Sequence, residues 1–208
     1  MGYQIDPESH GFILPFSSAV QFHGHICPGL AIGYYASHIG MRWLHTHISD
    51  NSEILVMVEN AGCGVDAVQT VTGRTVGNGN LILCDYGKQV YTFLIKGTGR
   101  GLRVSLKSEF TVDRLDPGLA SLQARVSGDE ATPEEVVDLP HRIERICRAI
   151  LETPGDVVFD IREVNEEHRG RGPRAGDVVC ARCGEPVSTD RAKKEKDGYY
   201  CQPCQRNG

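Results

Sequence analysis

The stretch CARCGEPVSTDRAKKEKDGYYCQPC, residues 180–204, decides how the C-terminal part of this chain folds. Two C-x-x-C pairs stand at its ends, formed by Cys180, Cys183, Cys201 and Cys204. This spacing is typical of a tetrahedral site in which four thiolates bind one zinc ion. Glycine and proline residues between the pairs suit the turns of two short hairpins. The stretch therefore predicts a zinc ribbon over residues 178–208.

Two disulfides or one redox pair are the alternatives to a zinc site. We expect that this chain has no secretory signal peptide. The other four cysteines lack the regular spacing of a disulfide framework, so a zinc site is favoured over disulfides. Four protein ligands close the coordination sphere, which predicts a structural site. A segment of about thirty residues buries too little apolar surface to fold alone, whereas structural zinc supplies about 10–16 kcal/mol in finger peptides. Zinc and fold should therefore be lost together.

The rest of the chain is long enough for one substantial core. We expect residues 1–164 to form this core and residues 165–177, which are polar and contain arginine and glycine, to form a linker. The formal net charge of −5 argues against a protein that coats nucleic acid. No segment approaches the roughly twenty apolar residues needed to cross a bilayer. These features predict a cytoplasmic protein that does not insert into membranes.

Helix-start signals and apolar runs predict an α+β core. Cys27 is expected to be the N-cap of a helix that begins with proline and ends near Leu44. A short run of strand formers, Glu53–Glu59, follows. A second loop then leads through Cys63 into a helix that ends near Val71. Two loop-to-helix junctions, each with a cysteine, are thus predicted in the first third of the chain.

Farther along, alternating apolar residues predict a meander of strands, and capping signals predict two helices. The expected strands are Leu81–Asp85, Lys88–Ile95, Leu102–Lys107 and Val157–Val164. The expected helices begin at Asp116-Pro117 and at the capping box Thr132-Pro133-Glu134-Glu135. Residues 1–20 are expected to be an arm docked on the core. The predicted fold class is α+β, with an antiparallel or mixed sheet packed with helices.

A second group of candidate ligands lies in the core, where His23, His25 and Cys27 occur at every second position. In a locally extended segment these side chains project to the same side and can converge on a metal. Cys63 lies at the similar junction farther along. A cysteine at a helix N-terminus is next to unpaired N–H groups, which lower its pKa and favour the thiolate that binds metals.

The spacing leaves open that Cys27 and Cys63 are small buried hydrophobic residues and that the histidines have no shared role. Cys84 lies in an apolar strand, and Cys147 shares a helix face with isoleucines. Both are expected to be core residues rather than ligands. Spacing alone therefore predicts one strong metal site and one candidate site.

Four motifs that occur in order resemble the E-subunit family of formylmethanofuran dehydrogenase. They are HGHICPGLAIG (residues 23–33), ENAGCGVDAVQ (59–69), TGRTVGNGN (72–80) and DYGKQVYTF (85–93). The resemblance covers about residues 15–165, and members of this family often carry a similar C-terminal ribbon, which matches residues 178–205. One departure is the Gly33-Tyr34-Tyr35 segment, where the family often has an arginine. An anion contact made by that arginine would be missing here.

The resemblance implies an α+β core, commonly a homodimer, with a site around the histidine and cysteine motif. His25, Cys27 and Cys63 become the preferred metal-binding or reactive residues, whereas His23, Asp85 and Lys88 are weaker candidates. The parent complex carries out redox chemistry on a one-carbon unit with metal cofactors held largely in other subunits. This chain lacks a clustered iron–sulfur cysteine run, so it is not expected to be the dehydrogenase by itself.

The favoured function is therefore a metal-binding accessory protein with a structural zinc ribbon, a second transition metal in the core, and a redox-enzyme complex as a candidate partner. Three ligands from His25, Cys27 and Cys63 would leave an open position, so a hydrolytic or lyase activity with Asp66 or His23 as base stays open. An alternative is a ribbon that binds other proteins, with a core that only dimerises or is purely structural. Nucleic-acid binding is least expected, because four thiolates on zinc offset the basic residues of the ribbon.

Overall fold

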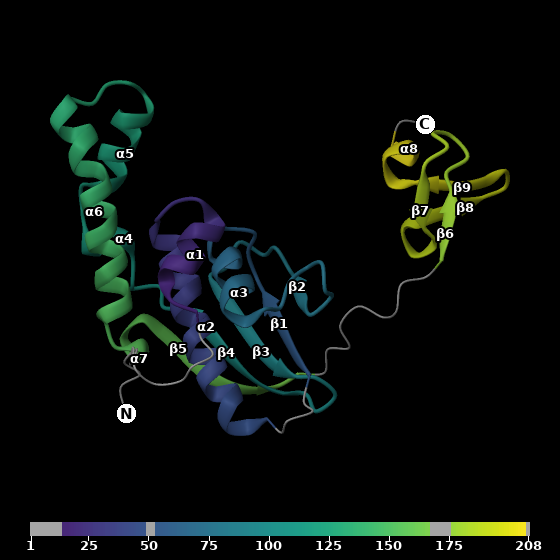
Figure 1. Ribbon diagram of the computed structural model, residues 1–208, viewed down its shortest axis with the longest axis horizontal. Helices are drawn as coiled ribbons and strands as arrows, with labels where there is room; N and C mark the ends of the chain where they lie inside the picture. Colours follow the sequence, from purple (N-terminus) through teal and green to yellow (C-terminus); the bar gives the residue numbers. More distant parts are fainter. Residues whose placement is uncertain (1–13, 49–52, 167–175, 207–208) are drawn as a thin grey trace. The chain divides into compact units, whose positions relative to one another are not determined.

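The structure, a computed structural model, describes residues 14–48, 53–166 and 176–206. The chain divides into two units, Met1–Gly170 and Arg171–Gly208, and each is described by itself (Figure 1). Strand β5 ends at Asn165 and strand β6 begins at Asp177, so most of the linker expected over residues 165–177 lies outside the described residues.

A five-stranded sheet forms the centre of the first unit. Its strands are β1 (Ile54–Val58), β2 (Leu81–Leu83), β3 (Val90–Ile95), β4 (Arg100–Leu106) and β5 (Phe159–Asn165). They lie in the order β2-β1-β3-β4-β5, with β1 and β2 parallel and the other pairs antiparallel. The α+β class with a mixed sheet is thereby confirmed.

The expected meander is wrong at its first step, because β3 pairs with β1 and not with β2. Val58 lies opposite Tyr91 of β3 on one side and opposite Leu83 of β2 on the other. A helix, α3 (Gly64–Thr72), connects β1 to β2. A crossover through a helix places the next strand parallel to the first, so β2 becomes an edge strand and the chain must return across β1 to form β3.

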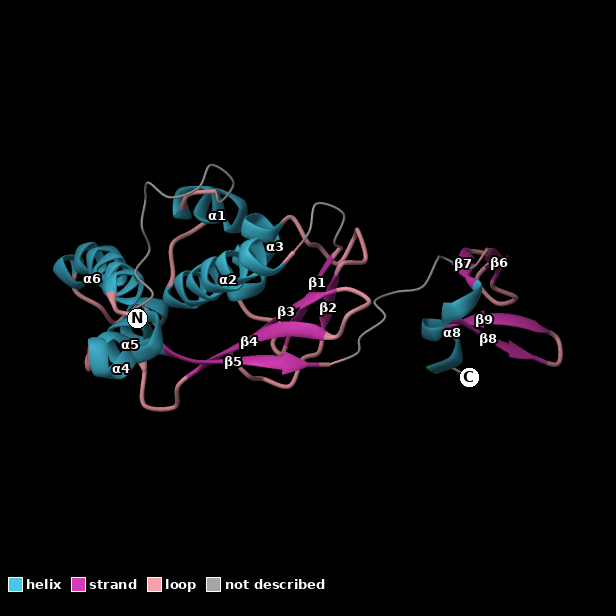
Figure 2. Cartoon of the chain, turned by 90° about the horizontal axis from the view of Figure 1, so that it is seen from below, coloured by secondary structure: helices cyan, strands magenta, loops and turns pink. Residues whose placement is uncertain are grey.

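Three helices, α1 (Phe16–His23), α2 (Pro28–His47) and α3, lie over one face of this sheet (Figure 2). Helix α2 is the central one, and most of its residues from Leu30 to Leu44 are buried. The N-cap role predicted for Cys27 is confirmed, since its sulfur accepts a hydrogen bond from the Leu30 N–H at 3.4 Å. The expected docked arm needs correction, because its described part forms helix α1 from Phe16 onward.

Glycines allow α2 to approach its neighbours unusually closely. A Cβ added to Gly33 would overlap the Cα and carbonyl of Gly64 at the start of α3. A Cβ added to Gly40 would overlap the ring of Phe93 in β3. Backbone therefore packs against backbone where α2 meets α3, and the N-terminal ends of the two helices lie side by side.

A helical hairpin follows β4. It consists of α4 (Val112–Leu115), α5 (Leu119–Ser127) and α6 (Pro133–Glu152), and the short helix α7 (Gly155–Val158) leads back into β5. The capping box predicted at Thr132 is confirmed, because Thr132 and Glu135 bond each other's backbone N–H groups.

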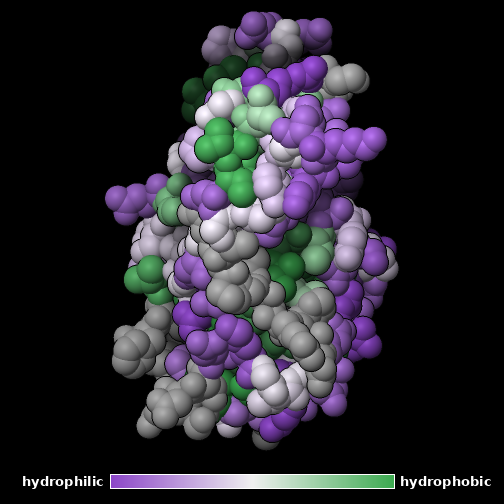
Figure 3. All heavy atoms as spheres, turned by 90° about the vertical axis from the view of Figure 1, so that its right-hand side faces the viewer, coloured by the Kyte–Doolittle hydropathy of each residue, from purple (hydrophilic) through white to green (hydrophobic). Residues whose placement is uncertain are grey.

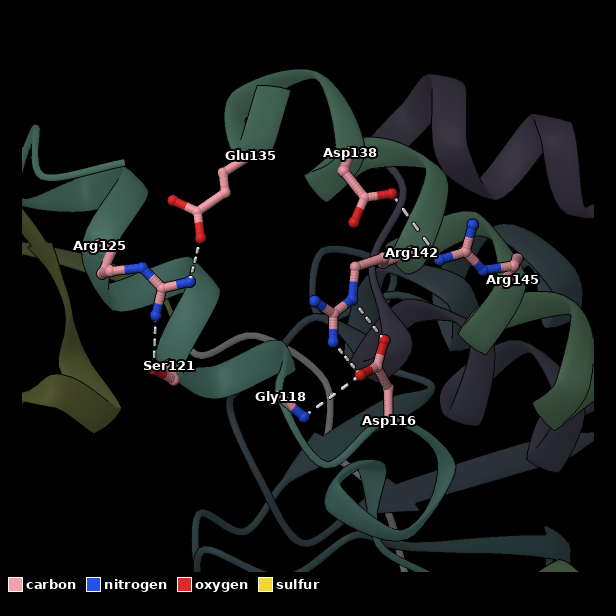
Figure 4. A network of polar contacts seen from close by, with 8 residues as sticks. All are labelled: Asp116, Gly118, Ser121, Arg125, Glu135, Asp138, Arg142 and Arg145. Carbon is pink, nitrogen blue, oxygen red and sulfur yellow. Dashed lines mark hydrogen bonds and ion pairs between the residues drawn. The ribbon is translucent and has the colours of Figure 1, made fainter. Parts of the chain in front are cut away.

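Ion pairs join the helices of this hairpin, as Figure 4 shows. Arg142 of α6 makes a two-pronged contact with the carboxylate of Asp116, which also accepts the Gly118 N–H. Arg125 of α5 bonds Glu135 of α6. Two-pronged contacts between guanidinium and carboxylate are directional, so the Arg142–Asp116 pair orients α6 against the junction between α4 and α5.

The second unit consists of two small hairpins. Strands β6 (Asp177–Val179) and β7 (Pro186–Ser188) form the first, and β8 (Ala192–Glu195) and β9 (Gly198–Cys201) form the second. A 3-10 turn, η1 (Thr189–Arg191), connects them, and a short helix, α8 (Gln202–Arg206), follows. This is the two-hairpin arrangement that the sequence predicts for the ribbon.

Hydrophilic side chains predominate on the face drawn in Figure 3, where hydrophobic side chains gather only in small groups. Large apolar side chains that remain well exposed in the described residues include Phe22, Tyr86 and Val137. Within the described ranges, no helix combines the length and apolar character needed to span a membrane.

We expect Gly33→Ala to lower the free energy of unfolding of the first unit by about 1–3 kcal/mol, because its methyl group would overlap the Gly64 backbone. Alanine's higher helix propensity, worth about 1 kcal/mol, opposes this effect only in part. Urea unfolding monitored by the fluorescence of Trp43 would measure the change. The control is Gly77→Ala, whose methyl group would meet only Thr75 Oγ1, at 3.7 Å. Equal midpoints for the two variants would contradict the expectation.

His38 predicts a pH dependence of stability. Burial, helped by the nearby Arg42 charge, lowers the pKa of His38 from 6.5 to about 4, and its Nε2 has no hydrogen-bond partner within the described residues. Between these values the unfolded chain takes up a proton that the folded chain does not, so stability falls as pH drops from about 6.5 to 4, by at most about 3 kcal/mol.

The measurement is urea unfolding of the wild type and of His38→Gln at several pH values between 4 and 7. The difference in unfolding free energy between the two proteins should change across this range, with the wild type losing more stability on acidification. A constant difference would show that His38 does not contribute to the acid sensitivity of the fold.

Candidate metal centres

His23, His25 and Cys27 converge at one end of helices α1 and α2. One potential ligand atom from each residue lies within 4.8 Å of the other two. His23 Nε2 is 3.8 Å from Cys27 Sγ, and the two imidazole rings have their centroids 4.4 Å apart. Zn–S and Zn–N bonds of ordinary length at a tetrahedral angle place sulfur and nitrogen about 3.6 Å apart. The observed separation is therefore close to that of two ligands on one metal ion.

The convergence arises differently from the extended segment expected from the sequence, and that geometric expectation is wrong. His23 is the last residue of α1, and Gly24 ends the helix in the left-handed region with φ of 92°. Glycine adopts this conformation without the steric cost of a side chain. The chain then reverses and enters α2 through the extended residue Cys27. A helix end and a tight turn, rather than alternation along a strand, bring the three side chains together.

The thiol of Cys27 is half-buried, and its burial outweighs the helix N-terminus. Burial raises the pKa of Cys27 to about 11; the Leu30 N–H opposes this rise, whereas Cys63 adds to it. The expectation of a lowered pKa at this junction is therefore wrong for Cys27 in the absence of a cation. At neutral pH the free thiol keeps its proton, and a metal would have to displace that proton on binding.

Cys63 lies beside Cys27 but does not belong to the group of three. It precedes α3, as predicted, although its side chain makes no capping hydrogen bond. Its loop is held by Asn60, which donates to the Lys88 carbonyl at 2.9 Å and accepts the Gly62 N–H at 3.0 Å. A role for Cys63 as a metal ligand stays a prediction.

Asp66, in the first turn of α3, contacts the group from its other side. Its Oδ2 is 2.7 Å from His23 Nδ1. The His23 side chain is 11% exposed, and the Asp66 side chain is 36% exposed. The sequence ranked His23 below Cys63, but in the structure His23 has a carboxylate partner and belongs to the group of three, which does not include Cys63.

The two other weaker candidates have their described contacts elsewhere. Asp85 accepts the Gly87 N–H at 3.3 Å in the loop between β2 and β3. Lys88 lies 3.9 Å from the carboxylate of Glu59, which also pairs with Arg103 of β4. None of these contacts involves the group around Cys27. The structure therefore does not bring Asp85 or Lys88 into one site with that group.

Tyr34 and Tyr35, at the position where the family often has an arginine, are buried packing residues. The Tyr34 hydroxyl donates to the Leu14 carbonyl, and the Tyr35 hydroxyl donates to the Thr153 carbonyl. Cys147 is buried in the core, as predicted. Cys84 follows the end of β2 and is only half-buried, so it is less enclosed than the apolar run around it suggested.

The second candidate centre is the ribbon, where Cys180, Cys183, Cys201 and Cys204 offer sulfur atoms that lie within 4.8 Å of one another. The Cys183 and Cys201 sulfurs are 3.9 Å apart. Two thiolates on one tetrahedral zinc ion lie about 3.8 Å apart, given ordinary Zn–S bonds. The four thiols of the ribbon therefore form a compact cluster of the right size for a metal with four sulfur ligands.

The electrostatics of this cluster favour a bound cation. N–H groups of Cys183 and Cys201 lower the pKa of Cys180 to about 6. Neighbouring thiols, with Cys201 first, raise the pKa of Cys204 to about 12. Four thiols crowded together cannot all lose their protons unless a positive charge compensates them. A divalent ion would supply that charge.

Comparisons with known proteins identify the family of the chain and relatives that it resembles. The family profile described as "FmdE, Molybdenum formylmethanofuran dehydrogenase operon" matches residues 22–160. A curated relative from Archaeoglobus fulgidus, named "Probable S-adenosyl-L-methionine-binding protein", is 32% identical over 184 residues. The match covers 84% of this chain and 49% of the relative, so the chain spans about half the length of that protein.

A solved structure has the same fold. It is the crystal structure of a protein from Syntrophus aciditrophicus described as "tungsten formylmethanofuran dehydrogenase subunit e (fmde)-like", and it superposes with a TM-score of 0.64 at 23% identity. The superposition covers 92% of this chain and 90% of that chain. The profile match includes the group around Cys27 and ends before the ribbon, whose first cysteine is Cys180.

We expect a strong zinc chelator to unfold the ribbon while the first unit stays folded. The two hairpins are small, and structural zinc contributes about 10–16 kcal/mol to the folding of comparable peptides. Hydrogen exchange followed by mass spectrometry would then show loss of protection over residues 177–206 and retained protection in β1 and β3. Cys180→Ser should give the same pattern without chelator. Unchanged protection of the ribbon in both experiments would contradict a metal-dependent fold.

Proposed function

The chain belongs to the FmdE family, and we propose that within this family it is a metal-binding accessory protein with two centres. One centre is a solvent-accessible core site formed by His23, His25 and Cys27. The other is a structural zinc site in the C-terminal ribbon. The observation that carries the proposal is the convergence of the three core ligands within 4.8 Å in the segment that the family profile covers.

The donor set of the core site suits a borderline transition metal. Imidazole nitrogen and thiolate sulfur together favour zinc and its neighbours over magnesium or calcium, which prefer oxygen ligands. His25 is exposed, whereas His23 and Cys27 are partly buried. The site is thus open to solvent on the side of His25, which gives a metal or a small ligand a path of entry.

Three protein ligands leave a coordination position free, which is the pattern of a site that handles a ligand rather than one that only supports a fold. Cys63 lies next to Cys27, so its thiol can complete the coordination or stay beside the open position. When bound, the metal would supply a Lewis acid at this end of the helices. The residues of the chain contribute the binding geometry and a half-buried environment.

The ribbon has the opposite character. Four cysteines fill a tetrahedral coordination sphere and leave no position for a substrate. The proposed role of the zinc ion is to keep the two hairpins of the ribbon folded, so that their surface can contact another protein. Protein binding is therefore proposed for the ribbon alone. Nucleic-acid binding is a less favoured function of the ribbon because the chain has a net negative charge.

The proposal includes partners and location. The family description refers to a formylmethanofuran dehydrogenase operon, so we propose a redox-enzyme complex as the setting in which this chain acts, and a homodimer as its own assembly. A reducing, cytoplasmic location is proposed because every cysteine in the described residues is a free thiol. The chain is not proposed to be the dehydrogenase by itself.

Metal content measured by inductively coupled plasma mass spectrometry on the full chain tests the proposal. We expect two metal ions per wild-type chain, because each centre binds one. Cys27→Ser should lose only the core metal, and Cys180→Ser combined with Cys183→Ser should lose only the ribbon metal. The protein must be purified without a metal-affinity resin.

Cys84→Ser is the matched control, since this half-buried thiol lies outside both groups. It should keep the full metal content. A wild-type chain with a single metal that disappears on mutation of the ribbon would overturn the core site and leave the ribbon as the only metal centre. Metal retained by Cys27→Ser would overturn the assignment of Cys27.

A further inference from the structure

Asp66 and His23 are brought together from different helices, although 43 positions separate them in the sequence. His23 ends α1 and Asp66 lies in the first turn of α3. The 2.7 Å contact joins Asp66 Oδ2 to His23 Nδ1, the ring nitrogen that faces away from Cys27. The other nitrogen, Nε2, is the one 3.8 Å from the Cys27 sulfur. The two nitrogens of this imidazole therefore have different partners.

This arrangement selects one tautomer of His23. A carboxylate oxygen can only accept a hydrogen bond, so Nδ1 must carry the hydrogen. In the neutral ring, Nε2 is then unprotonated, and its lone pair is available on the side of Cys27. A metal-binding imidazole needs such a lone pair, and in known metal sites the other nitrogen commonly donates to a carboxylate that sets the tautomer and the ring orientation.

We propose that Asp66 is the positioning residue of the core metal site, which holds His23 as the Nδ1–H tautomer and aims its Nε2 at the metal. The proposal rests on the proposed function, because it assumes that the core group binds a metal ion. It assigns to Asp66 neither a ligand role nor a base role, since the contacting oxygen is already bonded to His23.

A purely structural role for Asp66 is the competing explanation. An acidic residue in the first turn of a helix stabilises that helix by about 0.3–1 kcal/mol through the helix dipole. Such an effect would change the stability of α3 but not the tautomer of His23 or the affinity of one metal site. Metal affinity and tautomer are therefore the measurements that separate the two roles, and the ribbon provides an internal reference within the same chain.

The first experiment is a cobalt titration of the full chain after one equivalent of zinc has filled the ribbon. Cobalt bound by nitrogen and sulfur ligands gives visible absorption bands that report the geometry of the core site. We expect Asp66→Ala to weaken core cobalt binding by about 10- to 100-fold and to change its bands. Asp66→Asn should lie between it and the wild type, because an amide oxygen can still accept the Nδ1 hydrogen but lacks the charge.

Glu134→Ala is the matched control, because it removes a first-turn carboxylate from another helix, α6. It should leave the affinity and the spectrum of core cobalt unchanged, and none of these variants should change the metal in the ribbon. Fluorescence of Trp43 shows whether each variant is folded. Wild-type affinity and spectrum in a folded Asp66→Ala protein would overturn the positioning role.

The second experiment reads the tautomer directly in the metal-free protein. Two-bond correlations between ring protons and nitrogens of labelled histidine distinguish Nδ1–H from Nε2–H, and the His23 signals are assigned by their loss in His23→Gln. We expect Nδ1–H in the wild type and a shift toward Nε2–H in Asp66→Ala. If the wild type takes up no core cobalt, the proposed function and the metal-site role of Asp66 are both overturned. If core cobalt binds but the tautomer is unchanged in Asp66→Ala, the positioning role is overturned and the proposed function stands.

Discussion

The close approach of α2 and α3 at Gly33 and Gly64 is the constraint on which the candidate core site depends. No side chain fits between the two backbones there, and the Tyr91 hydroxyl occupies the remaining space beside Gly64. Because the helices meet near their N-terminal ends, the cysteines that precede them become neighbours. The same contact brings the first turn of α3 within reach of the end of α1, where Asp66 meets His23. Two residues without side chains thus determine which functional side chains meet.

The two centres solve the same electrostatic problem in different ways. In the ribbon, backbone N–H groups already stabilise one thiolate, at Cys180, and the neighbouring thiols resist further ionisation until a cation arrives. In the core, burial keeps the Cys27 thiol protonated, and the other two potential ligand atoms are imidazole nitrogens of His23 and His25. A site with four thiolates neutralises a divalent ion more than fully, whereas a site with one thiolate leaves positive charge on the metal. That residual charge is what a bound ligand at the core site would experience.

Local signals predicted local structure well. The Cys27 N-cap, the capping box at Thr132 and the two-hairpin ribbon each depend on a few consecutive residues, and the structure contains all three. The order of the strands could not be predicted from such local signals. It depends on long-range pairing, because β1 lies between β2 and β3 and pairs with both. The contact between His23 and Asp66 could not be predicted from the sequence either, since it depends on how α1 and α3 pack. The turn at Gly24 could have been considered from the sequence, because a glycine between two histidines permits a left-handed turn as readily as a strand.

The candidate core site is formed by elements of the first unit. Its candidate ligands are His23 at the end of α1 and His25 and Cys27 in the loop that leads into α2, and Asp66 lies in α3; all of them belong to the first unit. The family profile covers this region and ends before the ribbon. The contacts described above for His23, His25 and Cys27 involve residues of the first unit. The convergence of the three side chains follows from the turn at Gly24 and from the close packing of α2 against α3.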